Sequence, residues 1–284
     1  MRDGRTTAVD PATKLTVTLC DCTGAAADLA RAHLSGPVAS VYLAQALAAV
    51  AVLGAETDQK DETAVFKLDC TGPLGGFLAE VTAAGTLRGY TKRKTLDDFD
   101  GAGVPKDTDV LGEGGTFEVV RSVPGAILAS GAVAVGFKGR TGATAAGLDA
   151  FFSQSLQRRV RTAFAATSGD DGVPTLARGV AVECPPDGDA EAFGRVAELF
   201  SSGAAAAALA SGGTRTILAK LGLERAEVRG TVPLSFACRC SPERARGMIM
   251  ALPAEERAGM PATVDVVCHM CGRTYSVSTA APAK

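Results

Sequence analysis

The chain has little of several residue types, and each shortage narrows the classes of protein that it can be. Its 284 residues contain no tryptophan and only 5% aromatic residues, although 46% are hydrophobic. Alanine supplies much of that apolar content and buries little area per residue, so parts of the molecule are expected to pack weakly. The apolar fraction is still large enough for a sizeable core, which excludes wholesale disorder.

The net charge is small, and histidine is scarce. The formal net charge is −2, from 29 basic and 31 acidic residues, without a long run of like charges. This balance leaves no electrostatic footprint for general nucleic-acid binding. The two histidines are too few to assemble a convincing Ser-His-Asp or Cys-His site, so no enzyme is predicted. His33 lies on an apolar helical stretch and is interpreted as structural.

Sequence features that would direct the chain to or across a membrane are weak. Met1–Leu15 has no apolar stretch of the kind found in secretory signals. The most apolar run, Val38–Ala55, has the length of a span, but its alanine content, Ser40 and Gln45 favour a buried helix. Eight cysteines without a secretory signal indicate the reducing cytosol, so we expect a cytoplasmic protein without membrane partners.

The first 184 residues predict one mixed α+β domain, with an antiparallel sheet and packed helices. Short alternating segments separated by glycine-rich turns are typical of such a sheet. Strands are predicted at Lys14–Cys20, Ala64–Leu68, Phe77–Val81, Thr86–Thr91, Thr116–Arg121, Ala132–Phe137 and Ala177–Glu183. Helices are predicted at Ala25–Leu34, Val38–Leu53 and Leu148–Arg158.

A change of character at Pro185-Pro186-Asp187-Gly188 marks a domain boundary. Residues 185–232 are interpreted as a helical, metastable linker. Its segment Gly203–Gly213 has high helix propensity but mostly alanine to bury, so weak docking is expected. Helices are predicted on both sides of it, at Glu191–Phe200 and Thr216–Leu221.

Residues 233–284 form a small final module. Ser241-Pro242-Glu243 predicts a helix start, with serine as N-cap and proline in the first turn. Thr263–Val267 and Thr274–Ser278 are predicted strands on either side of a tight knuckle. A module of this size cannot support itself through its core alone, so a structural metal is expected.

Four cysteines of this module carry the chemistry. Cys238-Arg-Cys240 is followed, after 27 residues, by Cys268-His-Met-Cys271. Four thiolates make a closed tetrahedral shell for one Zn²⁺ per chain and leave no open position for catalysis. Cys20-Asp-Cys22 has no nearby partner pair, and Cys70 and Cys184 are interpreted as small hydrophobic residues.

The cysteine pattern resembles the C-terminal redox switch of the 33-kDa chaperonin family, because a C-x-C first pair is unusual among zinc ribbons. The resemblance rests on three segments: Phe236-Ala-Cys238-Arg-Cys240-Ser-Pro-Glu-Arg244, Leu252-Pro-Ala-Glu-Glu256, and Val264-Asp-Val-Val-Cys268-His-Met-Cys271-Gly-Arg-Thr-Tyr275. Upstream, Asp69–Gly76, Leu87–Tyr90 and Leu148–Gln157 resemble the family more weakly. Leu156, where a glutamate is expected, and the alanine-rich linker depart from the family pattern.

The resemblance implies a redox-regulated, ATP-independent holdase chaperone. In this family oxidation activates the chaperone, so the reduced, zinc-bound form is expected to be inactive. Disulfides Cys238–Cys240 and Cys268–Cys271 would then release the zinc, undock the linker and expose apolar surface to unfolding client proteins. A homodimer of the active form is expected from the same resemblance.

Two other functions remain open from the residues. A thiol-disulfide oxidoreductase could use Cys268 and Cys271, although a thioredoxin-like C-x-x-C should open a helix. A zinc-ribbon interaction module would need a basic face to bind nucleic acid, and the net charge provides none. Gly112–Gly115 is interpreted as a turn rather than a phosphate loop, because no Lys-Ser pair follows it.

Overall fold

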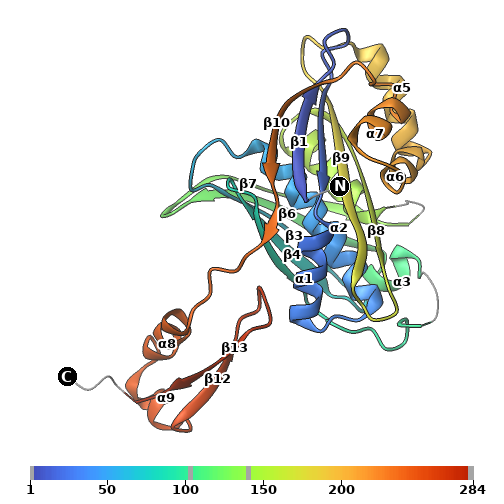
Figure 1. Cartoon of the computed structure of the whole chain (residues 1–284). Coiled ribbons are helices and arrows are strands. Elements are labelled where there is room, and N and C mark those ends of the chain that lie inside the picture. Colours follow the sequence, from blue (N-terminus) through green and yellow to red (C-terminus); the bar gives the residue numbers. More distant parts are fainter. Residues whose placement is uncertain (1–2, 102–104, 139–141, 281–284) are drawn as a thin grey trace.

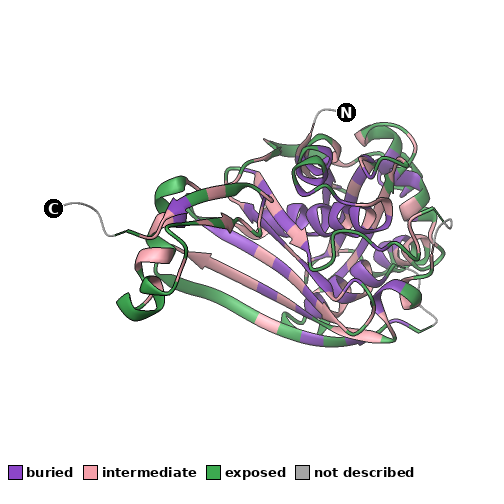
Figure 2. Cartoon of the chain, turned by 90° about the horizontal axis from the view of Figure 1, so that it is seen from below, coloured by how far each residue is buried: buried purple, intermediate pink, exposed green. Residues whose placement is uncertain are grey.

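A computed structural model describes residues 3–101, 105–138 and 142–280, and confirms the α+β class. Two mainly antiparallel sheets enclose the long helix α2 (Pro37–Leu53), which packs against both of them (Figure 1). Buried residues gather around α2 and the sheets that enclose it, whereas the C-terminal module is mostly exposed or half-buried (Figure 2).

The first sheet has five strands in the order β10-β1-β2-β9-β8. All its neighbouring pairs are antiparallel. Its strands are β1 (Gly4–Val9), β2 (Thr16–Asp21), β8 (Arg159–Ser168), β9 (Pro174–Cys184) and β10 (Glu227–Pro233). The sequence patterns predicted β2 and β9 but missed β1, β8 and β10.

The second sheet has six strands in the order β11-β5-β4-β3-β6-β7. The pair β11–β5 is parallel and the others are antiparallel. Its strands are β3 (Thr63–Cys70), β4 (Gly76–Thr82), β5 (Thr86–Thr91), β6 (Gly114–Val123), β7 (Ala126–Gly136) and β11 (Ser235–Phe236). Short helices α3 (Asp107–Leu111) and η1 (Gly54–Glu56) lie in its connections. The turn predicted at Gly112–Gly115 is confirmed, because Gly112 ends α3 and β6 begins at Gly114.

Helix α2 forms the centre of the core. Its segment Pro37–Glu56 is long and apolar enough to cross a membrane, yet 83% of the most apolar window is buried inside the protein. Such burial is that of a core helix. Alanine suits this position because small side chains let α2 approach both sheets closely. Helix α1 (Thr23–His33) packs beside it and ends at Leu34, which adopts a left-handed conformation with φ of 56°.

The helix predicted at Leu148–Arg158 has a different extent. Helix α4 (Ala143–Ala150) begins earlier and continues as the π-type turn η2 (Phe151–Ser155). The chain leaves the helix through Gln157, whose φ is 54°, and enters β8. Leu156 is 40% exposed, so replacing a polar residue there places an apolar side chain at the surface.

The segment expected to be a helical linker contains helices and also a strand. Helices α5 (Ala190–Ser201), α6 (Ala204–Leu209) and α7 (Thr214–Lys220) cover the outer face of the five-stranded sheet, and β10 then pairs with β1 (Figure 1). The buried cluster under these helices comprises Leu15, Val17, Leu19, Ala163, Val180, Val182, Cys184, Ala192, Phe193, Val196, Ala205, Leu209, Ile217, Leu218, Leu221 and Leu223. The leucine and isoleucine side chains that follow the alanine run therefore make apolar contacts within this cluster that the small alanine side chains do not make.

The C-terminal module lies on the opposite side of the domain from these helices (Figure 1). Helices α8 (Pro242–Met250) and α9 (Ala254–Ala258) precede the hairpin β12 (Thr263–Val267) and β13 (Thr274–Ser278). The predicted start of α8 is confirmed, because Ser241 Oγ accepts a hydrogen bond from the Arg244 amide at 3.2 Å.

Candidate metal centre

The first cysteine pair is positioned by strand β11. This strand pairs in parallel with β5, Ser235 opposite Thr86 and Phe236 opposite Leu87. The chain then leaves the sheet, and Cys238 and Cys240 lie in an irregular segment before α8. Because this segment is not an extended strand, the two thiols can turn toward the same point.

The second pair is positioned by the tight knuckle between β12 and β13. The Cys268 amide donates to the Arg273 carbonyl at 2.8 Å, and the Gly272 amide donates to the Cys268 carbonyl at 2.8 Å. Gly272 has a φ of 72°, which glycine adopts without the steric cost that other residues meet. The turn brings Cys271 back beside Cys268.

The four sulfur atoms meet at one point. Cys240 Sγ lies 3.4 Å from Cys271 Sγ, and Cys238 Sγ lies 3.8 Å from Cys268 Sγ. All four lie within 4.8 Å of one another. A tetrahedral zinc ion with Zn–S bonds of about 2.3 Å requires sulfur–sulfur separations of about 3.8 Å. The cluster therefore fits a four-thiolate zinc site.

Polar neighbours favour one ionised thiol in the cluster. Burial acts to raise the pKa of the Cys240 thiol, but hydrogen bonds from the Tyr275 hydroxyl and the Cys271 thiol help to lower that pKa to about 7. The Tyr275 oxygen lies 3.1 Å from Cys240 Sγ. Burial raises the pKa of the Cys271 and Cys268 thiols above their ordinary value. Without a metal, Cys240 is thus the thiol that ionises most readily among those whose pKa shifts.

The core domain contributes charged groups that the sequence patterns did not reveal. Arg88 on β5 points its Nη1 at Cys238 Sγ, 3.9 Å away. The Glu80 carboxylate on β4 accepts two hydrogen bonds from Arg88, at 2.9 and 2.8 Å, and one from Arg239 of the module. Glu80 and Arg88 face each other in the β4–β5 register, so the pair could be found only once these strands were aligned.

The basic residues that neighbour the cysteines in sequence make different contacts. The Arg239 guanidinium pairs with Glu80, and Arg244 donates to the Arg239 carbonyl at 2.8 Å. The His269 ring packs edge-on against Tyr90, with ring centroids 6.0 Å apart. Arg273 lies beside Tyr275, and the hydrogen bond with that hydroxyl raises the pKa of the Arg273 guanidinium.

The cysteine cluster is also a contact between module and domain. Cys271 is 4% exposed and belongs to the same buried cluster as α2. A Cβ on Gly272 would lie 2.4 Å from the Ala32 carbonyl oxygen at the end of α1. His33, in the next position, is buried and its Nε2 lies 2.9 Å from the Gly89 carbonyl oxygen, which fits its predicted structural role. The knuckle therefore packs directly on the C-terminus of α1.

The remaining cysteines lie apart from this cluster. In the part of the chain that is described, the only metal-competent group found is that of Cys238, Cys240, Cys268 and Cys271. Cys20 Sγ donates to the Ala48 carbonyl at 3.3 Å, and Cys22 Sγ donates to the Ala177 carbonyl at 3.5 Å. Both are buried in the core, Cys20 on β2 and Cys22 at the start of α1.

Comparison with known proteins identifies the family. The family profile described as "Hsp33 protein" matches residues 3–278 of the chain. The chain belongs to the Hsp33 family. A "33 kDa chaperonin" of Thermus thermophilus is 29% identical over 93% of this chain and 81% of its own length. One of Bacillus licheniformis is 27% identical over 86% and 85% of the respective chains.

The fold agrees with this assignment. The crystal structure of the 33 kDa chaperonin from Thermotoga maritima superposes with a TM-score of 0.80 and 20% identity, covering 98% of this chain and 96% of the other. The family resemblance noted on the cysteine motif is thereby confirmed. Membership of the Hsp33 family supports a chaperone function for the chain.

Proposed function

We propose that the chain is a redox-regulated, ATP-independent cytoplasmic holdase whose four clustered cysteines bind one Zn²⁺ in the reduced, inactive form. The observation that supports this most strongly is the place of the cluster. It lies where the module meets the core domain, with Cys271 almost fully buried in the contact. A change of state at the thiols therefore changes the contact.

The bound zinc would hold the two cysteine pairs together and so supply the cross-link that the small module lacks. Oxidation acts on the cysteines themselves. Two thiolates lose two electrons to one peroxide molecule, which takes up two protons from solvent and leaves as two water molecules, while a sulfur–sulfur bond forms. A disulfide cannot serve as a thiolate ligand, so Cys238–Cys240 and Cys268–Cys271 bonds would leave no ligand set.

Loss of this contact would reach the linker through β11 and β10. Both strands connect the module to the sheets, because β10 pairs with β1 and β11 pairs with β5. When β10 and β11 detach from the sheets, the chain that follows α7 is no longer held by β1, and helices α5 to α7 lose this attachment. The apolar residues beneath them, including Val17 and Leu19 on β2, would then be exposed to unfolded clients. A homodimer of the active form is part of the proposal.

The test compares zinc content, free thiols and suppression of client aggregation before and after peroxide treatment. We expect the oxidised protein to lose one zinc and four free thiols per chain and to gain holdase activity. Cys271→Ser should bind zinc weakly and be partly active without oxidant, whereas Cys70→Ser, outside the cluster, serves as the matched control. Retention of zinc in the oxidised protein, or activity that ignores oxidation, contradicts the proposal.

Timed alkylation with peptide mapping tests the disulfide pairing. A bond between Cys238 and Cys240 closes a small, strained ring, so Cys268–Cys271 should form first. The closest sulfurs in the reduced protein belong to different pairs, at 3.4 and 3.8 Å. Cross-linked bonds between these closest sulfurs, Cys240–Cys271 or Cys238–Cys268, would contradict the proposed Cys238–Cys240 and Cys268–Cys271 disulfides. Catalytic turnover of a dithiol substrate would favour an oxidoreductase, and an inert oxidised module would favour an interaction domain.

A further inference from the structure

Strand β7 presents an unusual free edge. It is the last strand of the six-stranded sheet, and among the described strands it pairs with β6 alone. Its 11 residues include no charged residue and no proline, and Ile127 and Leu128 are 69% and 42% exposed. Exposed edges normally carry lysine or proline, because unpaired backbone groups attract other extended chains. The β7 edge lacks both devices.

The register shows which backbone groups point outward. The Phe137 amide donates to the Glu113 carbonyl at 2.8 Å, just beyond the end of the strand. In an antiparallel ladder, hydrogen-bonded residue pairs alternate with pairs whose N–H and C=O groups point away from each other. Gly136 lies opposite Gly114, and Ala134 lies opposite Thr116. Counting back from Phe137, the N–H and C=O groups of Ala134 and Gly136 point away from β6.

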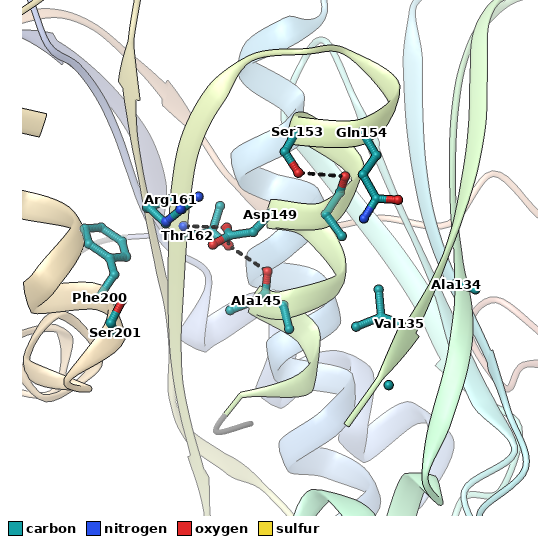
Figure 3. Close-up of a pocket in the computed structure, with 13 residues that line it drawn as sticks. Ala134, Val135, Ala145, Asp149, Ser153, Gln154, Arg161, Thr162, Phe200 and Ser201 are labelled. Carbon is teal, nitrogen blue, oxygen red and sulfur yellow. Dashed lines mark hydrogen bonds between the residues drawn. The ribbon is translucent and has the colours of Figure 1, made fainter. Parts of the chain in front are cut away.

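Ala134 and Gly136 are among the residues that line a cleft of about 570 Å³ (Figure 3). β7 forms one wall, α4 lies at the centre, and β8 with the end of the linker helix α5 lies on the other side (Figure 3). Much of the lining is small and uncharged, and its two charged residues, Asp149 and Arg161, are of opposite sign. The small lining residues are Ala134, Gly136, Ala145, Ala146 and Ala150. Space beside the β7 edge is thus open to another extended backbone.

The opposite side of the cleft is already paired. Asp149 of α4 accepts hydrogen bonds from the Thr162 amide at 2.8 Å and the Thr162 hydroxyl at 2.7 Å. These bonds occupy the Thr162 amide at the edge of β8, whereas among the described residues no other backbone group bonds the outward groups of Ala134 and Gly136. The backbone hydrogen-bonding capacity left on the β7 side is therefore that of an unpaired strand, and the side chains of Gln154 and Arg161 also line the cleft.

We propose that the β7 edge binds an extended, uncharged segment of an unfolded polypeptide, which adds to the six-stranded sheet as a further strand. This inference rests on the proposed holdase function and names the surface that holds the client. Pairing through main-chain groups does not depend on the client's sequence, which suits a protein that must hold many different chains. Phe200 and Ser201 of α5 line the cleft, so undocking of the linker would widen it.

The test uses a fluorescent, uncharged decapeptide of high β-propensity and the full-length oxidised protein. Ala134→Pro removes an outward N–H while leaving the β6 ladder paired, and edge strands tolerate proline at such positions. Ala134→Val keeps the N–H and is the matched control. We expect binding to weaken about tenfold in Ala134→Pro and to change less than twofold in Ala134→Val.

Residue-resolved hydrogen exchange of the unsubstituted protein gives a second measurement. On peptide addition, the amides of Ala134 and Gly136 should become protected, while those of Val133 and Val135 are protected already. Unchanged exchange at the outward amides, or equal peptide binding by both variants, overturns the proposal. If the amides of Ala134 and Gly136 become protected without peptide as the protein concentration rises, the edge pairs with a second copy of the chain. This result would also overturn the proposal. Failure of the holdase function appears separately, as absent aggregation suppression by the oxidised, unsubstituted protein.

Discussion

Replacing Gly272 with alanine is expected to push the cysteine knuckle off the end of α1 and to activate the protein without oxidant. Gly272 follows the ligand Cys271 and lies against the Ala32 carbonyl. That carbonyl belongs to the last turn of α1, which the left-handed Leu34 terminates. Neither backbone can move independently, so an added methyl group must separate the module from the domain.

The magnitude follows from the geometry. The new Cβ would lie 2.4 Å from the Ala32 oxygen and 3.2 Å from its carbonyl carbon, whereas real Cβ contacts are essentially never under 3.0 Å. Overpacking of this kind costs about 1–3 kcal/mol. The undocked fraction should therefore rise roughly 5- to 150-fold. The φ of 72° adds about 1–2 kcal/mol of strain for alanine, which weakens the knuckle itself.

The assay is suppression of client aggregation by the reduced, zinc-loaded variant, together with hydrogen exchange around Ala32. Two controls separate the effects. Gly125→Ala introduces a similar φ strain, at 86°, where nothing lies within 4 Å. Gly247→Ala lies inside α8 of the same module, also with nothing within 4 Å. If Gly272→Ala retains full zinc content, full protection at Ala32 and no activity when reduced, the reasoning about this contact is wrong.

Three further outcomes are expected. Glu80→Ala removes the link between Arg239 and the domain and takes away the carboxylate partner of Arg88. Docking should therefore weaken by about 1 kcal/mol, and half-maximal activation should need less peroxide. An unchanged peroxide titration would contradict this. Tyr275→Phe removes a hydrogen bond to the thiolate, so the pKa of Cys240 in the reduced, metal-free protein should rise above about 7, as measured by the pH dependence of alkylation; an equal or lower pKa would show that the hydroxyl is not the cause. Chelation of the metal from the reduced protein should increase proteolysis within residues 234–278 before the core domain, and simultaneous cleavage of both regions would show that the module has no separate dependence on metal.

Local patterns were sufficient for the parts of the chain whose chemistry is local. The spacing of Cys238, Cys240, Cys268 and Cys271 predicted a single cluster, because two short motifs can each direct a pair of sulfurs at one ion. The structure brings all four within 4.8 Å. The start of α8 at Ser241 was equally readable, since a serine cap and a first-turn proline act within one helical turn.

Long-range pairing decided what the sequence alone left out. Strands β1 and β10 pair with each other although more than 200 residues separate them, and such pairing leaves no local pattern in the sequence. The Glu80–Arg88 pair and its bond to Arg239 exist only because β4, β5 and the module meet. The sequence by itself determined which residues can bind the metal and which family the chain resembles. Only the tertiary structure decided that the cysteine cluster lies on the contact with α1, because that contact joins residues more than 200 positions apart, which no local pattern can encode.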